Sequence, residues 1–281
     1  GKYTKSFQSF MLTERSFDAG EVTINYAQGP ANGSPLVLLH GGTDRWAAFE
    51  SVIPALSEEW HIYALDFRGH GKSGRVPGAY RIPQYASDIV SFLRNHVGEP
   101  ATLLGHSMGA DSSLWIAAEA PDTVRAAVLE EPLYSHNGTR IKEFAVYPSL
   151  LAFQAAISTQ GSARDITSEL TRLRPNWPES LIREKAECLS ILDPDVLSLI
   201  VEGHHTDGYD TEDLLPRISA PVLMIQGDPE RGGLLNDSEA QRMQSLLRDC
   251  TFVKMPGSGH EPHNRQTDKF LEIFKRFFDG S

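Results

Sequence analysis

Short apolar runs recur along the first half of the chain, each with the length of a buried strand. They lie at residues 36–39, 61–65, 101–104 and 124–129, and residues 22–26 alternate between apolar and polar positions as a strand does. The segments between the later runs carry apolar positions at helical spacing, at 47–58, 83–96 and 110–120. Because strands that alternate with helices along a chain form a mainly parallel sheet covered by helices on both faces, we expect an α/β fold.

The alternation stops after residue 132. Residues 133–216 show no clear strand pattern, and three helices are predicted there, at 144–160, 163–173 and 178–192. Strand patterns return at 221–226 and 251–255, and helices are expected at 237–247 and 266–278. We therefore predict a core of residues 1–132 and 217–281, built on an eight-stranded sheet. A helical lid, residues 133–216, is inserted after the sixth strand.

Residues 105–109 read Gly-His-Ser-Met-Gly, a Gly-x-Ser-x-Gly motif between a predicted strand and a predicted helix. This context is typical of a nucleophile elbow, a tight turn that presents one hydroxyl to a cleft. Glycines flank the serine because its backbone is strained and close to neighbouring structure. The motif therefore predicts Ser107 as a nucleophile.

A serine hydroxyl needs a base to accept its proton. We predict His260 for this role, because it follows the last strand in a Gly-rich loop, residues 257–260, at the edge of the sheet where sites form. His40 and His106 are interpreted as structural, and His263 as the start of the final helix. The remaining histidines are weaker candidates; His204 and His205 are expected in a polar loop of the lid.

An oxyanion hole needs two N–H donors directed at the developing negative charge. The residue that follows the nucleophile, Met108, is expected to supply one. The loop after the strand at 36–39 reads His-Gly-Gly-Thr, and we predict the N–H of Gly42 as the other. A glycine there lets the backbone approach a reacting carbonyl without a side chain in the way.

These motifs together resemble the α/β-hydrolase superfamily. They are His-Gly-Gly at 40–42, Asp-x-Arg-Gly-His-Gly-x-Ser at 66–73, the Ser107 pentapeptide and Gly-x-Gly-His at 257–260, in the order of that family. The resemblance spans roughly residues 20–280. It implies an α/β-hydrolase fold and a catalytic triad, while one fold can host many chemistries.

The third member of the triad should be a carboxylate that orients the histidine. Asp228 and Glu230 follow the strand at 221–226, where most of the superfamily places it. Glu131 follows the preceding strand, 24 residues after Ser107. That spacing resembles the zearalenone-type lactonases over about thirty residues, which favours Glu131. Glu130 is expected to face the opposite side of its strand.

We therefore expect a serine hydrolase that cleaves a carboxylic ester or lactone through an acyl-enzyme, with a Ser-His-Glu triad of Ser107, His260 and Glu131. The substrate is expected to be a small molecule, and the motifs imply no metal and no organic cofactor. Amide, C–C bond and peracid chemistry on the same triad remain open. So does a binding protein that keeps the fold, as hormone receptors of the superfamily do.

Composition narrows the partners. The formal net charge of −11 argues against nucleic acid, which requires basic surface. No window has the roughly 18 apolar residues of a membrane span, and the first residues lack the apolar core of a signal peptide, so we expect a cytoplasmic protein. Because the sequence starts with Gly and not with Met, a leader removed from the protein stays one of the alternatives.

Cys188 and Cys250 suit neither a disulfide framework nor a metal cluster. The sequence is also compatible with a homodimer whose two copies contact each other through the lid.

Overall fold

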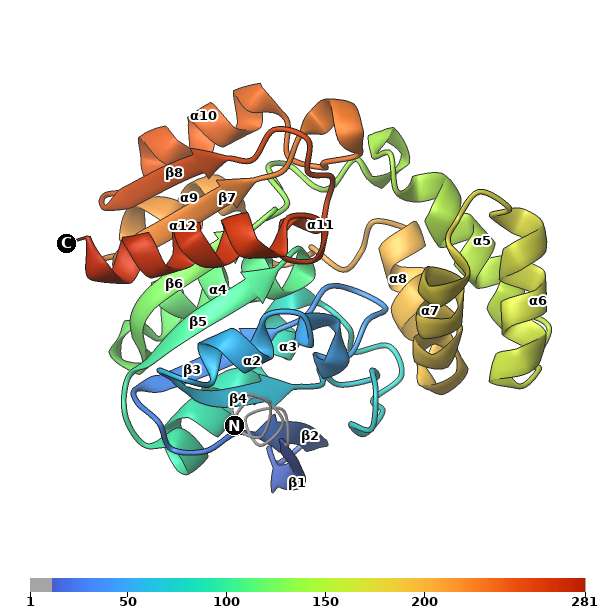
Figure 1. The fold of residues 1–281 in the computed structure, drawn as a ribbon, viewed down its shortest axis with the longest axis horizontal. Coiled ribbons are helices and arrows are strands. Elements are labelled where there is room, and N and C mark those ends of the chain that lie inside the picture. Colours follow the sequence, from blue (N-terminus) through green and yellow to red (C-terminus); the bar gives the residue numbers. More distant parts are fainter. Residues whose placement is uncertain (1–11, 281) are drawn as a thin grey trace, which may run out of the picture.

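The computed structural model describes residues 12–280, which form one eight-stranded sheet with the strand order β1-β2-β4-β3-β5-β6-β7-β8 (Figure 1). The first two strands are antiparallel to each other, β2 is antiparallel to β4, and the others run parallel. The strands are β1 (Thr13–Asp18), β2 (Thr23–Gln28), β3 (Pro35–Leu39), β4 (His61–Leu65), β5 (Ala101–His106), β6 (Val124–Glu130), β7 (Val222–Gln226) and β8 (Cys250–Lys254). The predicted eight-stranded, mainly parallel sheet is confirmed.

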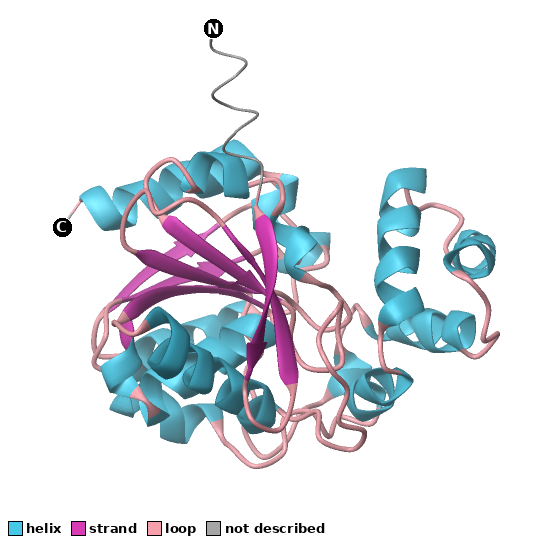
Figure 2. Ribbon diagram, turned by 90° about the horizontal axis from the view of Figure 1, so that it is seen from below, coloured by secondary structure: helices cyan, strands magenta, loops and turns pink. Residues whose placement is uncertain are grey.

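Helices cover both faces of this sheet, as Figure 2 shows. One face packs against α3 (Ile82–Phe92), α4 (Met108–Glu119) and α10 (Asp237–Leu246). The other face packs against α2 (Ile53–Leu56) and α12 (Thr267–Asp279). With both faces buried, the central strands must be apolar at nearly every position, which is why they appear in the sequence as continuous runs.

Alternate residues of one strand separate into the two cores. Val37 and Leu39 of β3 belong to the core with α3 and α4. Leu36 and Leu38 belong to the core with α12. This separation follows from the two-residue repeat of a strand, whose successive side chains point to opposite faces.

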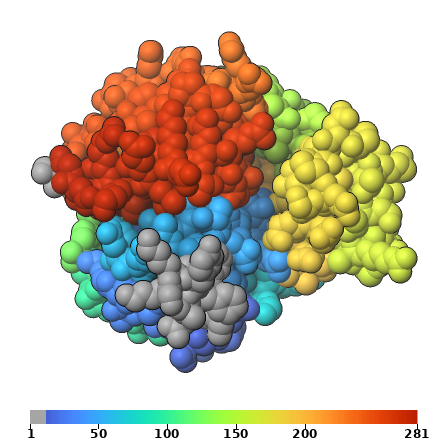
Figure 3. All heavy atoms as spheres, viewed as in Figure 1, coloured from blue at the N-terminus to red at the C-terminus, as the bar shows by residue number. Residues whose placement is uncertain are grey.

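Between β6 and β7 the chain leaves the sheet and forms a group of four helices, here called the cap: α5 (Tyr147–Ile157), α6 (Ala163–Leu173), α7 (Glu179–Ile191) and α8 (Pro194–Val201). The cap stands as a separate lobe beside the core (Figure 3). The short helix α9 (Thr211–Leu214) then leads back to β7. Within residues 12–280, none of the helices has the length and apolar character needed to cross a membrane.

Several elements differ from the sequence prediction, and the short helices α9 and Pro262–Arg265 are among those that it did not include. Strand β1 was not predicted, because its side chains are mostly exposed and it is held by backbone pairing with β2 at the edge of the sheet. The single helix predicted at 47–58 is two short helices, Trp46–Phe49 and α2. Pro54 lies in the first turn of α2, where a missing N–H is tolerated; inside a longer helix it would break the hydrogen-bond pattern. Helix α8 was also not predicted.

Candidate active site

Ser107 occupies the turn between β5 and α4, with backbone angles of φ 53° and ψ −114°. This positive φ is unusual for a residue with a side chain, and such strain is typical of functional sites. A Cβ atom on Gly105 would lie 2.2 Å from the carbonyl oxygen of Gly109, and one on Gly109 would lie 1.9 Å from that of Leu39. Both flanking positions of the motif therefore require glycine.

His260 lies in the loop between β8 and the short helix α11 (Pro262–Arg265). Its Nδ1 atom is 3.2 Å from Oε1 of Glu131, the residue directly after β6. The Glu131 carboxylate is fully buried and also accepts hydrogen bonds from the N–H groups of Gly227 at 2.9 Å and Leu234 at 2.6 Å. These three donors compensate for the burial of its charge.

The two alternative carboxylates lie elsewhere. Asp228 accepts hydrogen bonds from the N–H groups of Glu230 at 3.0 Å and Gly257 at 2.9 Å. It thereby caps the short helix Pro229–Arg231. The side chain of Glu230 is exposed. Of the three candidate acids, Glu131 is the one with an oxygen in hydrogen-bonding distance of His260.

The environment of His260 favours its protonated form. Burial lowers the pKa of the imidazole, but the hydrogen bond and negative charge of Glu131 more than offset that effect. The negative charges of Glu261 and Glu130 raise the pKa further, so that the pKa of His260 lies above its usual value. An imidazole held in this way is a stronger base than one in water.

A second histidine and glutamate pair lies beside the first. Glu130 points to the other side of β6 and accepts hydrogen bonds from His263 Nδ1 at 2.6 Å and from the His263 backbone N–H at 2.7 Å. The other ring nitrogen of His263 donates to the carbonyl oxygen of Ala48 at 2.9 Å. Burial lowers the pKa of His263, but the Glu130 charge raises it to about 9. His263 lies in α11, so the prediction that it starts the final helix is wrong.

The loop after β3 carries Gly42 and is fixed by two buried histidines. The His40 ring donates from Nδ1 to the carbonyl oxygen of Gly41 at 2.7 Å and accepts the N–H of Phe67 at Nε2 at 3.1 Å. The His70 ring accepts the N–H of Thr43 at 3.0 Å. Burial lowers the pKa of His40 to about 4 and that of His70 to about 3, so both rings stay neutral and act as structural links.

A cavity of about 670 Å³ lies between the core and the cap. Ser107, His260, Gly42 and Met108 all line it, although they come from three separate segments of the chain. A Cβ atom on Gly42 would lie 3.6 Å from the sulfur of Met108, so the two residues predicted to supply the oxyanion donors are neighbours in the cavity wall. The structure thus brings the predicted nucleophile, base and oxyanion residues to one cavity.

The cap supplies the apolar side of this cavity. Its lining side chains there include Leu150, Phe153, Trp177 and Ile200, and Phe144 lies just before α5. His205 also lines the cavity and is buried, which lowers its pKa to about 4. His204 and His205 do lie in a loop, as predicted, but His205 is buried in the cavity wall and not in polar surroundings.

The cap is joined to the β3 loop by charged side chains of α7. Lys185 Nζ lies 2.5 Å from Asp44 Oδ1 and 2.9 Å from the hydroxyl oxygen of Thr43. The Arg45 guanidinium pairs with Glu184 at 3.2 Å and Glu187 at 3.0 Å. The same loop therefore carries both Gly42 and the attachment point of the cap.

The fold and the cavity agree with a comparison to known families: residues 34–264 match the α/β-hydrolase fold family, and the chain belongs to it. It is similar to the 2-(acetamidomethylene)succinate hydrolase of Mesorhizobium japonicum, with 27% identity over 274 residues, 95% of each chain. A crystal structure of E-2-(acetamidomethylene)succinate hydrolase has a TM-score of 0.77 and 25% identity, covering 96% of this chain and 100% of that one.

Two further relatives show how varied the chemistry of the family is. The N-formylmaleamate deformylase of Pseudomonas putida is 26% identical over 264 residues, covering 93% of this chain and 94% of that one. The 3-oxoadipate enol-lactonase 2 of Acinetobacter baylyi is 26% identical over 216 residues, covering 74% of this chain and 76% of that one. The chain is therefore an α/β hydrolase. The likeness of its elbow-to-acid segment to zearalenone-type lactonases stays a prediction.

Proposed function

We propose that this hydrolase cleaves carboxylic esters or lactones through an acyl-enzyme formed on Ser107. The observation that carries the proposal is the arrangement around the cavity. Ser107 lies on a strained turn between two glycines that tolerate no side chain, and His260 faces the same cavity with its Nδ1 3.2 Å from a buried carboxylate. Nucleophile, base and orienting acid are the parts that acyl transfer requires.

In the proposed mechanism the Ser107 oxygen attacks the substrate carbonyl while His260 Nε2 accepts the hydroxyl proton. Glu131 accepts a hydrogen bond from Nδ1–H, which keeps Nε2 free to act as the base and stabilises the imidazolium that forms. The N–H groups of Gly42 and Met108 stabilise the oxyanion of the tetrahedral intermediate. His260 then gives its proton to the leaving alcohol oxygen, and the ester is left on Ser107.

The second half of the cycle repeats these steps with water. His260 removes a proton from the water molecule, the resulting hydroxide attacks the acyl-enzyme, and the proton passes to the Ser107 oxygen as the acid leaves. With a lactone, alcohol and acid remain in one product molecule. The apolar side chains of the cap would surround the acyl or alcohol group and exclude bulk water.

A fluorophosphonate probe and a panel of p-nitrophenyl esters and lactones would test this proposal. We expect the probe to label the wild type once, at Ser107, and not to label Ser107→Ala. We also expect Ser107→Ala to lose turnover of every substrate in the panel. Wild-type rates in Ser107→Ala would refute the assignment of the nucleophile.

Hydrolysis of an N-acyl bond is a second candidate, because two of the full-length relatives have the names of an acetamidomethylene succinate hydrolase and a deformylase. The same triad would serve, with His260 giving its proton to the leaving nitrogen. Comparing kcat/KM for an ester and an amide of the same acyl group separates the two proposals. A higher value for the amide would favour the second candidate.

A further inference from the structure

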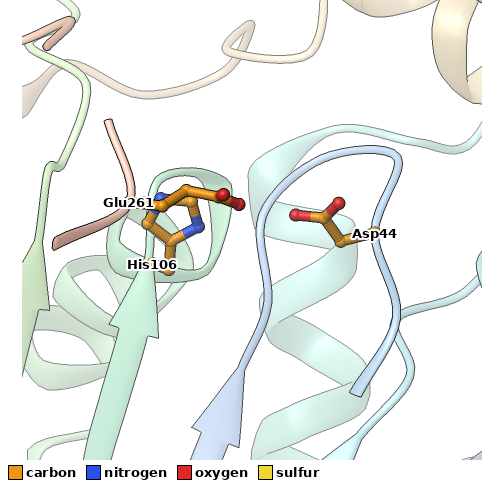
Figure 4. A group of neighbouring side chains, drawn as sticks. All are labelled: Asp44, His106 and Glu261. Carbon is orange, nitrogen blue, oxygen red and sulfur yellow. The ribbon is translucent and has the colours of Figure 1, made fainter. Parts of the chain in front are cut away.

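Three side chains that can hold a metal ion converge in the wall of the cavity. Asp44 lies in the loop after β3, His106 is the last residue of β5, and Glu261 follows His260. One ligand atom from each lies within 4.8 Å of the other two. Figure 4 shows the carboxylates of Asp44 and Glu261 pointing toward one another beside the His106 ring. All three residues line the cavity.

The hydrogen bonding of His106 leaves one ring nitrogen as a lone-pair donor. Nε2 of His106 is 2.7 Å from the carbonyl oxygen of His260. A carbonyl oxygen only accepts hydrogen bonds, so in the neutral ring the proton resides on Nε2. Nδ1 then carries the lone pair. It is buried in a residue that is 2% exposed and has no hydrogen-bond partner among the described residues.

That lone pair faces other acceptors. A Cβ atom placed on Gly41 would lie 3.0 Å from His106 Nδ1 and 3.3 Å from Asp44 Oδ2, so both atoms border the same small volume. The Lys185 ammonium contacts Asp44 at the other carboxylate oxygen, Oδ1, at 2.5 Å. The buried Nδ1 lone pair of His106 and the free oxygen of the Asp44 carboxylate thus border one small volume, and Nδ1 has no hydrogen-bond partner among residues 12–280.

We propose that Asp44 Oδ2, His106 Nδ1 and a Glu261 carboxylate oxygen bind a divalent transition-metal ion, with Zn²⁺ the best match. An imidazole nitrogen disfavours Mg²⁺ and Ca²⁺, which select oxygen ligands. Three protein ligands and a position open to a cavity are the arrangement of zinc sites that also bind water or substrate. The second N–H of a metal-binding histidine is typically held by a carbonyl or carboxylate, as the His260 carbonyl holds that of His106. This proposal departs from the sequence-based expectation that no metal is used.

Lys185 sets the strength of this site. Its ammonium neutralises part of the charge of Asp44 and repels a cation nearby. Replacing it by an uncharged side chain of similar length should therefore strengthen metal binding.

Metal binding can be measured without substrate, so that this proposal and the proposed hydrolysis fail independently. Chelator-treated full-length protein would be titrated with Zn²⁺ by calorimetry and with Co²⁺ by visible absorption. We expect one equivalent to bind to the wild type, with Co²⁺ bands of a low-coordinate site. His106→Gln and Glu261→Gln should each weaken binding by about 10- to 100-fold or more. Lys185→Met should tighten it.

His136→Gln is the matched control. His136 lies on the surface between Asp210 at 2.9 Å and Glu212 at 3.2 Å, but both of its ring nitrogens already face these carboxylates. It should keep the wild-type stoichiometry and affinity. The proposal is overturned if the wild type binds neither ion, if His106→Gln and Glu261→Gln both bind as the wild type does, or if Lys185→Met binds more weakly. Circular dichroism of each variant separates loss of a ligand from loss of the fold.

Discussion

At the scale of single residues, the direction of one side chain distinguishes two neighbouring glutamates. Glu130 is the last residue of β6 and Glu131 follows it directly, and each pairs with a different histidine: Glu130 with His263 and Glu131 with His260. Successive residues of a strand point to opposite sides, which explains why the two cannot exchange roles. The order of the glutamates along β6 therefore decides which carboxylate reaches the cavity.

Replacing Glu131 by Gln should lower kcat/KM by about 10³- to 10⁴-fold, because an amide no longer stabilises the imidazolium or fixes the tautomer of His260. Asp228→Asn serves as the matched control, since Asp228 only accepts backbone N–H groups of its own and a neighbouring loop. Steady-state kinetics with one p-nitrophenyl ester would measure both. Equal losses in the two variants would contradict the assignment of the acid.

The pH dependence of activity should reflect the raised pKa of His260. The proposed base works only when neutral, so kcat/KM should fall as the pH drops through that pKa, above the usual value of 6.5. Because Glu131 raises this pKa, the residual activity of Glu131→Gln should fall off only at a lower pH than the activity of the wild type does. An unshifted or higher limb in the variant would count against the Glu131–His260 interaction as its cause.

At the scale of elements, the site is built by the turns that end the strands. The nucleophile follows β5, the acid follows β6, the Gly42 loop follows β3 and the base follows β8. These strands are parallel, so their carboxyl ends meet at one edge of the sheet. Residues that are far apart in sequence thereby reach a common cavity without any of them lying in the regular part of an element.

Gly109→Ala should disrupt the junction between β5 and α4. The added methyl group would lie 1.9 Å from the carbonyl oxygen of Leu39, so the helix or the strand must move. We expect a loss of several kcal/mol in the free energy of unfolding together with a loss of probe labelling at Ser107. Urea unfolding would measure the first effect.

Gly98→Ala is the control for that variant. Gly98 has a positive φ of 73°, and nothing lies within 4 Å of an added Cβ. Gly98→Ala therefore measures only the cost of placing alanine at a positive φ, about 1 kcal/mol, without a steric clash. If the two alanine variants were equally stable, the close contact at Gly109 would not matter.

At the scale of the whole molecule, the buried Glu130–His263 pair joins β6 to α11 and, through the carbonyl oxygen of Ala48, to the segment after β3. Both side chains are fully buried. The intact pair adds little to the free energy of unfolding, because burying two charges costs about as much as their attraction returns. Removing one charge is strongly destabilising, because the other then stays buried without a partner. The pair therefore matters most when one partner is lost.

Glu130→Gln should lower the free energy of unfolding by about 3–5 kcal/mol near neutral pH. His263 has its pKa raised from 6.5 to about 9, so the stability it contributes is fully present below pH 6.5 and is lost as the pH rises through about 9. The pKa of Glu130 is lowered, because the attraction of His263 exceeds the opposing effect of burial, so its contribution is lost only as the pH falls below 4.5.

The difference in unfolding free energy between wild type and Glu130→Gln should therefore be largest between pH 4.5 and 6.5 and should narrow toward pH 9. Urea unfolding at several pH values would test this. Glu272→Gln, which alters an exposed pair with Arg276, is expected to show little change at any pH. A difference that grows from pH 6.5 to pH 9 would contradict the proposed charge state of His263.

Much of this architecture is encoded locally. Apolar runs and alternating apolar positions predicted seven of the eight strands, and the runs are continuous in the central strands because these are buried on both faces. Strand β1 lacks that signal, since an exposed edge strand is held by its backbone. The turn at Ser107 is equally local, because its two glycines lie where a side chain would clash with neighbouring backbone atoms.

The sequence by itself determined the parallel sheet, the elbow and the short list of residues that a serine hydrolase would need. It left Glu131, Asp228 and Glu230 open, because each follows a strand and only their directions in space distinguish them. The tertiary structure decided which carboxylate contacts His260, and it brought Lys185 of the cap to Asp44 and His106 to Glu261. Contacts of this kind join segments separated by more than a hundred residues, and no local pattern of hydrophobic and polar positions encodes them.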